Sequence, residues 1–280
     1  MDRWFGAPGP DGVGERAEGP PRGWFEIFSR HYWGLLLLAV VPMLLEAFHF
    51  NVVEGMMIYF SLFWFFLFRR LAHVKLGPSA LFVDLLAYLF AGTFGAGLAA
   101  AGESLALGMG AGAWIQSRHF ALAATGSILF VGLVEEAAKQ VWVLGVLGWD
   151  RLRRRDPRPM SYLMIGIMTG LGFSAIENID YVERGIFLDI SQHVGGVGVV
   201  TALTRALYTP FLHAIWAATL AWMLAVAARR RQVGMAFSGW LGMAALHGLY
   251  DASLRFSLWL SLVVVAFSYF VFLYAMRQSV

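Results

Sequence analysis

Apolar segments long enough to cross a lipid bilayer take up most of this chain, and they constrain its fold more than any other feature. A helix needs about 20 mainly apolar residues to cross roughly 30 Å of hydrocarbon, and within lipid only helices and closed barrels satisfy their own backbone hydrogen bonds. Hydrophobic residues make up 59% of the sequence and charged residues 14%. We place eight spans, at about 33–50, 52–69, 80–101, 120–148, 160–181, 198–228, 234–254 and 257–276. The sequence therefore predicts an all-α, polytopic transmembrane helix bundle.

Basic residues gather in alternate connections between these spans and predict the orientation of the bundle. The largest internal clusters lie at 69–75, 151–158 and 229–231. Cytoplasmic connections carry an excess of Lys and Arg, so both termini are predicted to be cytoplasmic. Because this topology explains the basic clusters and the net charge of +3, we expect contact with the lipid bilayer and no nucleic acid partner.

The first residues differ in composition from the rest. Residues 1–23 are rich in Gly, Pro and charged side chains and contain no apolar core of the kind found in signal peptides. We predict a disordered cytoplasmic tail over 1–23 and a single transmembrane domain over 24–280. Nothing in the sequence indicates an oligomeric state.

Ionisable residues inside the predicted spans point to a polar site within the membrane. A charge at the middle of a spanning helix costs roughly 2.5 to 3.5 kcal/mol on insertion scales, so a chain that keeps several such residues is expected to use them. They are Glu135, Glu136, Lys139, Glu177, Arg205, His213, His247 and Asp251. The chain has no cysteine, so a metal would have to be held by histidines and carboxylates.

The fourth span contains the sequence VEEAAKQ, in which Glu135 and Lys139 are four residues apart and share a helix face. Glu136 lies about 100° round the helix from Glu135. We interpret one carboxylate as a general base that activates water, and the other as a partner of the site or of Lys139. The alternative is an ion pair that only neutralises the helix.

The fifth span contains FSAIENIDY, in which Phe173, Glu177 and Tyr181 are spaced four apart on one face. Glu177 could coordinate a metal or stand opposite Glu135 as a second carboxylate, and Asn178 is a further candidate. The alternative is a helix end that reaches the polar headgroups, with Tyr181 in the interfacial aromatic belt.

The sixth and seventh spans each contribute a histidine. In the sixth, Pro210 is expected to free a backbone carbonyl near Arg205 and His213, and broken helices at membrane depth tend to line polar cavities. In the seventh, His247 and Asp251 are four residues apart, which suits a histidine oriented by a carboxylate. Carboxylates and histidines on four successive spans match the ligands of a divalent metal such as zinc.

This pattern resembles the PrsW family of intramembrane proteases, which is related to the CAAX prenyl endopeptidases. The resemblance covers about 120–255, and it rests on four motifs that occur in order on consecutive spans. They are EExxK (Glu135, Glu136, Lys139), FxxxENxxY (Phe173, Glu177, Asn178, Tyr181), a third motif with Arg205, His213 and Trp216, and HxxxD (His247, Asp251).

The resemblance implies an endopeptidase in the cytoplasmic membrane of a bacterium that cleaves a membrane-anchored protein near the external face, such as an anti-sigma factor. It makes Glu135 and Glu136 essential, with Glu177, His213 and His247 completing the site. Our hypothesis assigns Glu177, His213 and His247 to a divalent metal, with zinc as the expected ion. The catalytic group would be Glu135, Glu136, Lys139, Asn178, Arg205 and Asp251.

Three alternatives stay open at the level of the sequence. In a metal-free enzyme, Glu135 and Glu177 would share the activation of water while the histidines stabilise the oxyanion. A proton-coupled transporter would use the same buried groups as a proton relay, although such proteins often show paired broken helices and only Pro210 interrupts a span clearly here. A non-catalytic binding or scaffolding relative would keep the fold without turnover.

Overall fold

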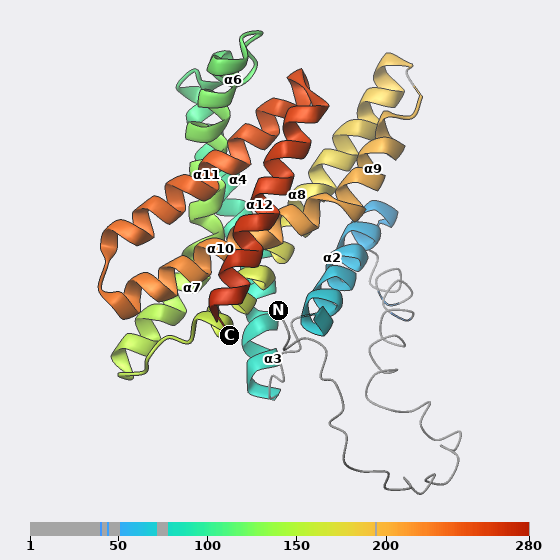
Figure 1. Ribbon diagram of the computed structural model, residues 1–280. Coiled ribbons are helices and arrows are strands. Elements are labelled where there is room, and N and C mark those ends of the chain that lie inside the picture. The colour runs from blue at the N-terminus through green and yellow to red at the C-terminus, as the bar shows by residue number, and fades with distance from the viewer. Residues whose placement is uncertain (1–39, 41–43, 45–50, 72–77, 194, 280) are drawn as a thin grey trace, which may run out of the picture.

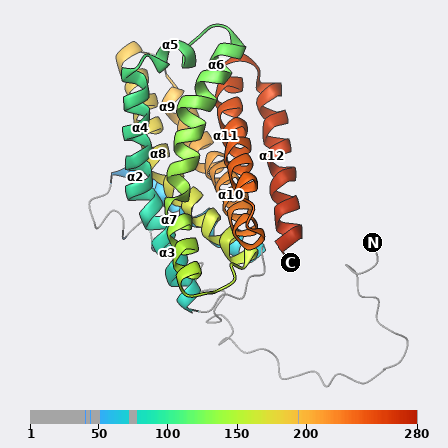
Figure 2. The same cartoon turned by 90° about the vertical axis from the view of Figure 1, so that its left-hand side faces the viewer.

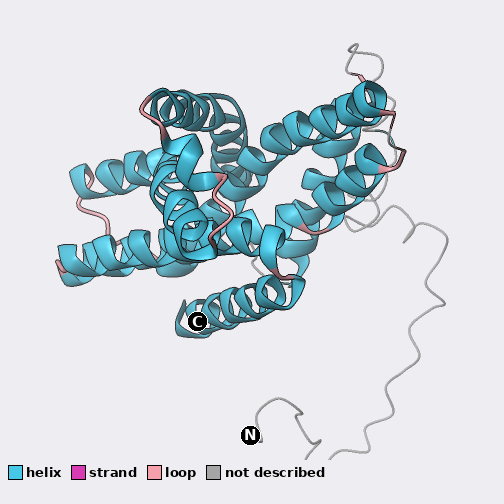
Figure 3. Ribbon diagram, turned by 90° about the horizontal axis from the view of Figure 1, so that it is seen from above, coloured by secondary structure: helices cyan, strands magenta, loops and turns pink. Residues whose placement is uncertain are grey.

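The computed structural model describes residues 40, 44, 51–71, 78–193 and 195–279, and every regular element within them is helical (Figures 1 and 3). The predicted tail and first span lie almost entirely outside these residues. The elements are α2 (Val52–Leu71), α3 (Pro78–Phe90), η2 (Ala91–Gly95), α4 (Ala96–Gly108), α5 (Ala111–Ile115), α6 (Phe120–Ser127), η3 (Ile128–Gly132), α7 (Leu133–Leu152), α8 (Pro159–Gln192), α9 (Val197–Leu207), α10 (Thr209–Arg230), α11 (Val233–Phe256) and α12 (Leu258–Ser279).

Five helical segments of the described chain are long and apolar enough to cross a membrane. They are Leu81–Gly108, Phe120–Leu152, Pro159–Gln192, Val197–Arg230 and Leu258–Gln278. α2 adds a shorter apolar stretch, Val52–Phe68, and α11 occupies the position of the predicted seventh span. The prediction of an all-α, multi-pass membrane protein is confirmed, whereas the full number of spans and the orientation of the termini stay predictions.

Two helices run well past the predicted ends of their spans. The third span was expected to end at 101, but its helix continues through α4 to Gly108, and α8 continues to Gln192 rather than ending near 181. At 1.5 Å per residue, the 34 residues of α8 extend about 51 Å, which is longer than the hydrocarbon layer. The spans were predicted from the length of apolar sequence, and the predicted third span therefore stopped before the polar residue Glu103.

Two of the long helices contain a π-helical turn. η2 joins α3 to α4, and η3 joins α6 to α7 immediately before Glu135 and Glu136. A π turn fits one extra residue into a helix and is frequently found at functional sites. Because the extra residue rotates everything that follows, η3 sets the direction in which both glutamates leave α7.

α8 and α10 lie at the centre of the bundle. In the most apolar 18-residue windows, 78% of Pro159–Gln192 and 72% of Val197–Arg230 is buried, against 28% to 39% in the other three segments. Figures 1 and 2 show the remaining helices arranged around this pair. Gly170 of α8 packs directly on the backbone of His213 in α10, where a Cβ atom would not fit. Small residues permit this close approach between membrane helices, and here it fixes the position of His213.

Candidate active site

The ionisable residues singled out from the sequence, together with Asn178, converge in the structure, although they come from five helices. They are Glu135, Glu136 and Lys139 on α7, Glu177 and Asn178 on α8, Arg205 on α9, His213 on α10, and His247 and Asp251 on α11. Ion pairs and ring contacts connect them into one cluster inside the bundle. Their convergence is an observation, while their catalytic roles stay predictions.

Lys139 lies between the two carboxylates of its own helix. Its Nζ is 2.7 Å from Glu136 Oε1 and 3.2 Å from Glu135 Oε2, and the whole side chain is buried. The ammonium group also lies 4.5 Å from the ring centroid of Phe173. A buried charge that loses its partner is strongly destabilising, so these three side chains hold one another in place. The ion pair expected from the spacing is therefore present, but as part of a larger network.

His247 extends this network from α7 to α11. Its Nδ1 is 2.9 Å from Glu136 Oε1, and the same oxygen also accepts a hydrogen bond from Lys139 Nζ. Its Nε2 is 3.7 Å from Glu135 Oε2 and 3.5 Å from Asp251 Oδ2. The ring of Trp216 stacks on the imidazole with centroids 4.8 Å apart. With Glu136 ionised, Nδ1 is the hydrogen-bond donor, and Nε2 remains on the side of Glu135 and Asp251.

Glu177 is the centre of a second group of contacts, formed by α8, α9 and α10. Arg205 Nη1 donates to Glu177 Oε1 at 3.1 Å and to Asn178 Oδ1 at 3.3 Å. His213 Nε2 lies 3.0 Å from Glu177 Oε2. The guanidinium group of Arg205 lies over the ring of Tyr181, with its Cζ 3.4 Å from the centroid. Glu177 is thus held by a cation on one oxygen and faces an imidazole with the other.

The break between α9 and α10 lies beside the Glu177 group and shares Arg205 and Asn178 with it. The helix is interrupted at Tyr208, and Pro210 has no N–H to donate to the carbonyl of Ala206 four residues earlier. Trp64 Nε1 donates to that carbonyl at 3.3 Å, and Asn178 Nδ2 donates to the carbonyl of Arg205 at 2.8 Å. Side chains of α2 and α8 therefore replace helix hydrogen bonds that lipid could not replace. Pro210 therefore releases a helix carbonyl near the site, and Trp64 donates to it.

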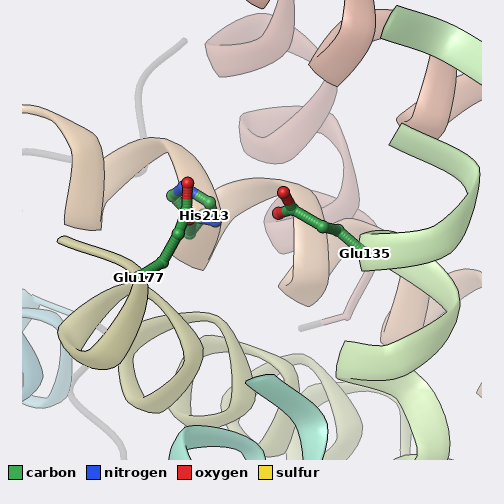
Figure 4. Close-up of side chains that lie close together, drawn as sticks. All are labelled: Glu135, Glu177 and His213. Atoms are coloured by element: carbon green, nitrogen blue, oxygen red, sulfur yellow. The ribbon is translucent and has the colours of Figure 1, made fainter. Parts of the chain in front are cut away.

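Glu135, Glu177 and His213 form a compact group in which the two contact networks meet (Figure 4). One ligand atom from each lies within 4.8 Å of the others. Figure 4 shows the carboxylate of Glu135 extending from α7 toward the pair formed by Glu177 and His213. His247 is not a member of this group among the described residues, although its ring lies 5.4 Å, centroid to centroid, from that of His213.

Comparison with known families decides what kind of protein carries this site. Residues 84–276 match the family described as PrsW family intramembrane metalloprotease. This range contains every residue of the cluster and more than half of the chain. The chain belongs to the PrsW family. Neither the curated proteins nor the solved structures contain a match to it.

Membership of the PrsW family makes the chain an intramembrane metalloprotease, with a membrane protein as its substrate. The predicted family and enzyme class are confirmed, and the transporter interpretation loses its support. The matched range begins at residue 84, so it also includes the helix formed by α3, η2 and α4, which the predicted core of 120–255 left out.

The PrsW family implies a metal, and the compact group fits one. Two carboxylates and an imidazole are suitable donors for a divalent ion. Among the described residues, His213 Nδ1 is a buried atom without a hydrogen-bond partner, while His213 Nε2 faces Glu177 Oε2. If His213 Nε2 donates to Glu177, then Nδ1 carries a lone pair. The cluster also has four carboxylates against the two cations Lys139 and Arg205, so a divalent ion would offset its excess of negative charge.

Glu103 is a neighbour of the site that the sequence analysis missed. It lies on α4, and its carboxyl group lies close enough to that of Glu135 for the two to interact electrostatically. The predicted third span ended two residues earlier, which placed Glu103 in an outer connection. A carboxylate within a glycine-rich and alanine-rich stretch was the available signal, because a charge that interrupts an apolar run needs an explanation if the helix continues.

Proposed function

We propose that this protein is an endopeptidase that cleaves a membrane-anchored protein at the cluster formed by α7, α8, α10 and α11. The observation that carries the proposal is the compact group of Glu135, Glu177 and His213, in which a glutamate of one helix faces a glutamate and a histidine of two others within 4.8 Å. Water activation by a carboxylate needs such proximity to the water and to the groups that position it.

In this proposal, Glu177 and His213 hold the metal, and zinc is the expected ion because its usual ligands include histidine and carboxylate. When bound, such an ion supplies Lewis acidity to a water molecule and to the scissile carbonyl. Arg205 keeps Glu177 in position through Oε1. Asn178 supports Arg205 by accepting from its guanidinium group and donating to its carbonyl.

Glu135 is the general base of the proposed reaction. It accepts a proton from the attacking water and can return it to the leaving amine. Glu136 is less suited to this role, because its Oε1 already accepts from Lys139 and His247 and its side chain is fully enclosed. We assign Glu136 and Lys139 to positioning: they hold His247 and limit the directions that Glu135 can take.

His247 and Asp251 would act on the substrate carbonyl. We proposed from the sequence that His247 either ligates the metal or polarises this carbonyl, and its separation from the compact group supports the second role. His247 Nε2 is free to donate toward an oxyanion beside Glu135, and Asp251 at 3.5 Å favours the protonated ring. Asp251 would therefore orient and support His247.

The membrane topology supports a site in the outer half of the bilayer. We propose both termini on the cytoplasmic side, a tail over 1–23 and one transmembrane domain over 24–280, in the cytoplasmic membrane of a bacterium. The α7/α8 connection with its arginines and the end of α12 lie at the same end of the bundle (Figure 1). With this topology, the enzyme would cleave a single-span regulator, such as an anti-sigma factor, near the external face of the membrane.

The proposal is tested by cleavage of single-span bacterial membrane proteins by the purified chain in liposomes. We expect product from the wild type, and a loss of roughly 10²- to 10⁴-fold in Glu135→Gln, the range that general bases contribute. Glu183→Gln is a matched control, because Glu183 is exposed on α8. Equal product from Glu135→Gln and the wild type would refute the assignment. A cellular effect that persists in Glu135→Gln would favour the scaffold interpretation.

A further inference from the structure

An open cavity of about 360 Å³ lies between α7, α10 and α11, outside the catalytic cluster. Its lining is apolar apart from Gln140 and the indole nitrogen of Trp240, and it includes Leu144, Leu224 and Phe237. Leu144 and Phe237 are about half exposed on the outer surface of the bundle. In a membrane-spanning bundle, these two side chains would face lipid.

Gln140 lines the cavity and carries a buried oxygen that no other described residue satisfies. The side chain is only 3% exposed, and its Nε2 donates to the carbonyl of Ala217 in α10 at 3.2 Å. The Oε1 atom has no hydrogen-bond partner among the described residues. The amide cannot be reversed to its advantage, because Oε1 would then face another carbonyl oxygen. The Trp240 N–H is already used, since it donates to the carbonyl of Leu133.

The cavity lies one helical turn from the catalytic residues. Gln140 follows Glu136 by four residues on α7, and Ala217 follows His213 by four residues on α10. Four residues advance a helix by about 6 Å, which an extended peptide covers in about two residues. A peptide bound at Gln140 would therefore need only about two further extended residues to reach the level of Glu136 and His213.

We propose that this cavity binds an unwound segment of the transmembrane substrate, with Gln140 Oε1 accepting a hydrogen bond from a substrate backbone N–H. The inference rests on the proposed function and adds a docking site to it. A lipid acyl chain could fill the apolar space, but it has no donor for Gln140. A regular helix uses its N–H groups internally, so only a segment that has left the helix offers one. Such a segment is also the one whose peptide bond is accessible for cleavage.

The site would therefore select substrates by their readiness to unwind. In lipid, an N–H released from a helix has no water to bind, so an acceptor held in an apolar cavity favours the unwound state. Apolar side chains next to the free N–H would fill the space lined by Leu144, Leu224 and Phe237. Helix-breaking residues about two positions from the scissile bond would then promote cleavage.

Photo-crosslinking tests the proposal without requiring turnover. Benzoylphenylalanine replaces Phe237 in the Glu135→Gln protein, in phosphatidylcholine and phosphatidylglycerol vesicles. The probes are two synthetic peptides with 20-residue Leu/Ala cores, one with a central Gly-Gly pair and one without. We expect several-fold more crosslinking of the Gly-Gly peptide, and roughly tenfold less after Gln140→Leu, the loss expected for one buried hydrogen bond. Benzoylphenylalanine at Val263, exposed on α12, serves as the control position.

A second variant protects the test against misfolding. Ala236→Phe adds a large side chain to the cavity lining from α11 while keeping Gln140, and it should also lower the crosslinking of the Gly-Gly peptide. Equal crosslinking of both peptides, crosslinking to lipid alone, or crosslinking that survives both Gln140→Leu and Ala236→Phe would overturn the proposal. Failure of the proposed function is a separate result, namely equal cleavage by the wild type and Glu135→Gln.

Discussion

The two halves of the candidate active site differ in how far they are closed. On the α7 and α11 side, Lys139 and Glu136 have side chains with no exposed surface, and short contacts join them to His247. On the α8, α9 and α10 side, Glu177 keeps 16% of its side-chain surface exposed. Glu136 Oε2 is buried without a hydrogen-bond partner among the described residues, whereas Glu177 Oε2 faces His213 Nε2 and part of the Glu177 side chain stays exposed. The part of the first half around Lys139 is a fixed support, whereas a ligand can reach Glu177 and also Asp251, whose side chain is 31% exposed at the edge of α11.

The largest effect is expected at the accessible half. Glu177→Gln removes a proposed metal ligand and the partner of Arg205, so we expect loss of the metal and of roughly 10³-fold or more in cleavage rate. Elemental analysis of the purified protein, together with a cleavage assay, measures both. Asp180→Asn is the control on the same helix, because Asp180 is exposed and pairs only with exposed Arg184. Full metal content in Glu177→Gln would place the ion elsewhere.

Substitutions in the closed half, on the α7 and α11 side, should lower the stability of the protein. Lys139→Met leaves two buried carboxylates without their cation, and breaking a buried pair costs about 3 to 5 kcal/mol. Thermal unfolding in detergent would show this loss. Adding Glu136→Gln to the variant should restore part of it. Arg229→Met removes a surface ion pair with Asp156, and its effect should stay below about 1 kcal/mol. A Lys139→Met protein as stable as the wild type would contradict the idea of a fixed support.

The smallest effect is expected at the helix break behind the site. Trp64→Phe leaves the carbonyl of Ala206 without its donor, which should lower stability by about 1 kcal/mol. Trp259→Phe is the control, since Trp259 is 79% exposed. Unfolding of both variants in the same detergent makes the comparison. Equal stability would show that the carbonyl finds another donor.

Spacing within a helix predicted the local part of this site well. The pairing of Lys139 with Glu135 and the proximity of His247 to Asp251 both follow from i,i+4 geometry. Contacts between helices could not be predicted from the sequence, because they depend on how each helix is rotated about its axis. The bond between His247 and Glu136 is an example, since η3 shifts the register of α7 and nothing in an apolar run marks a π turn.

The ends of the helices and the positions of cavities also could not be predicted from the sequence. Apolar length predicted where lipid contact would stop, but α4 continues to Gly108 and carries Glu103 toward Glu135. Gln140 appeared only as the last letter of a motif, because its missing partner is a property of three packed helices. The family pattern supplied the residues of the site, and the structure supplied the contacts from which we propose different roles for Glu135 and Glu136.

The most direct test of the account measures metal content and cleavage in one preparation of Glu135→Gln. Because Glu177 and His213 are proposed to hold the ion and Glu135 to act as the base, this variant should keep the wild-type amount of metal and lose roughly 10²- to 10⁴-fold in cleavage rate. Loss of the metal along with activity would make Glu135 a ligand, and undiminished cleavage would show that the base lies elsewhere.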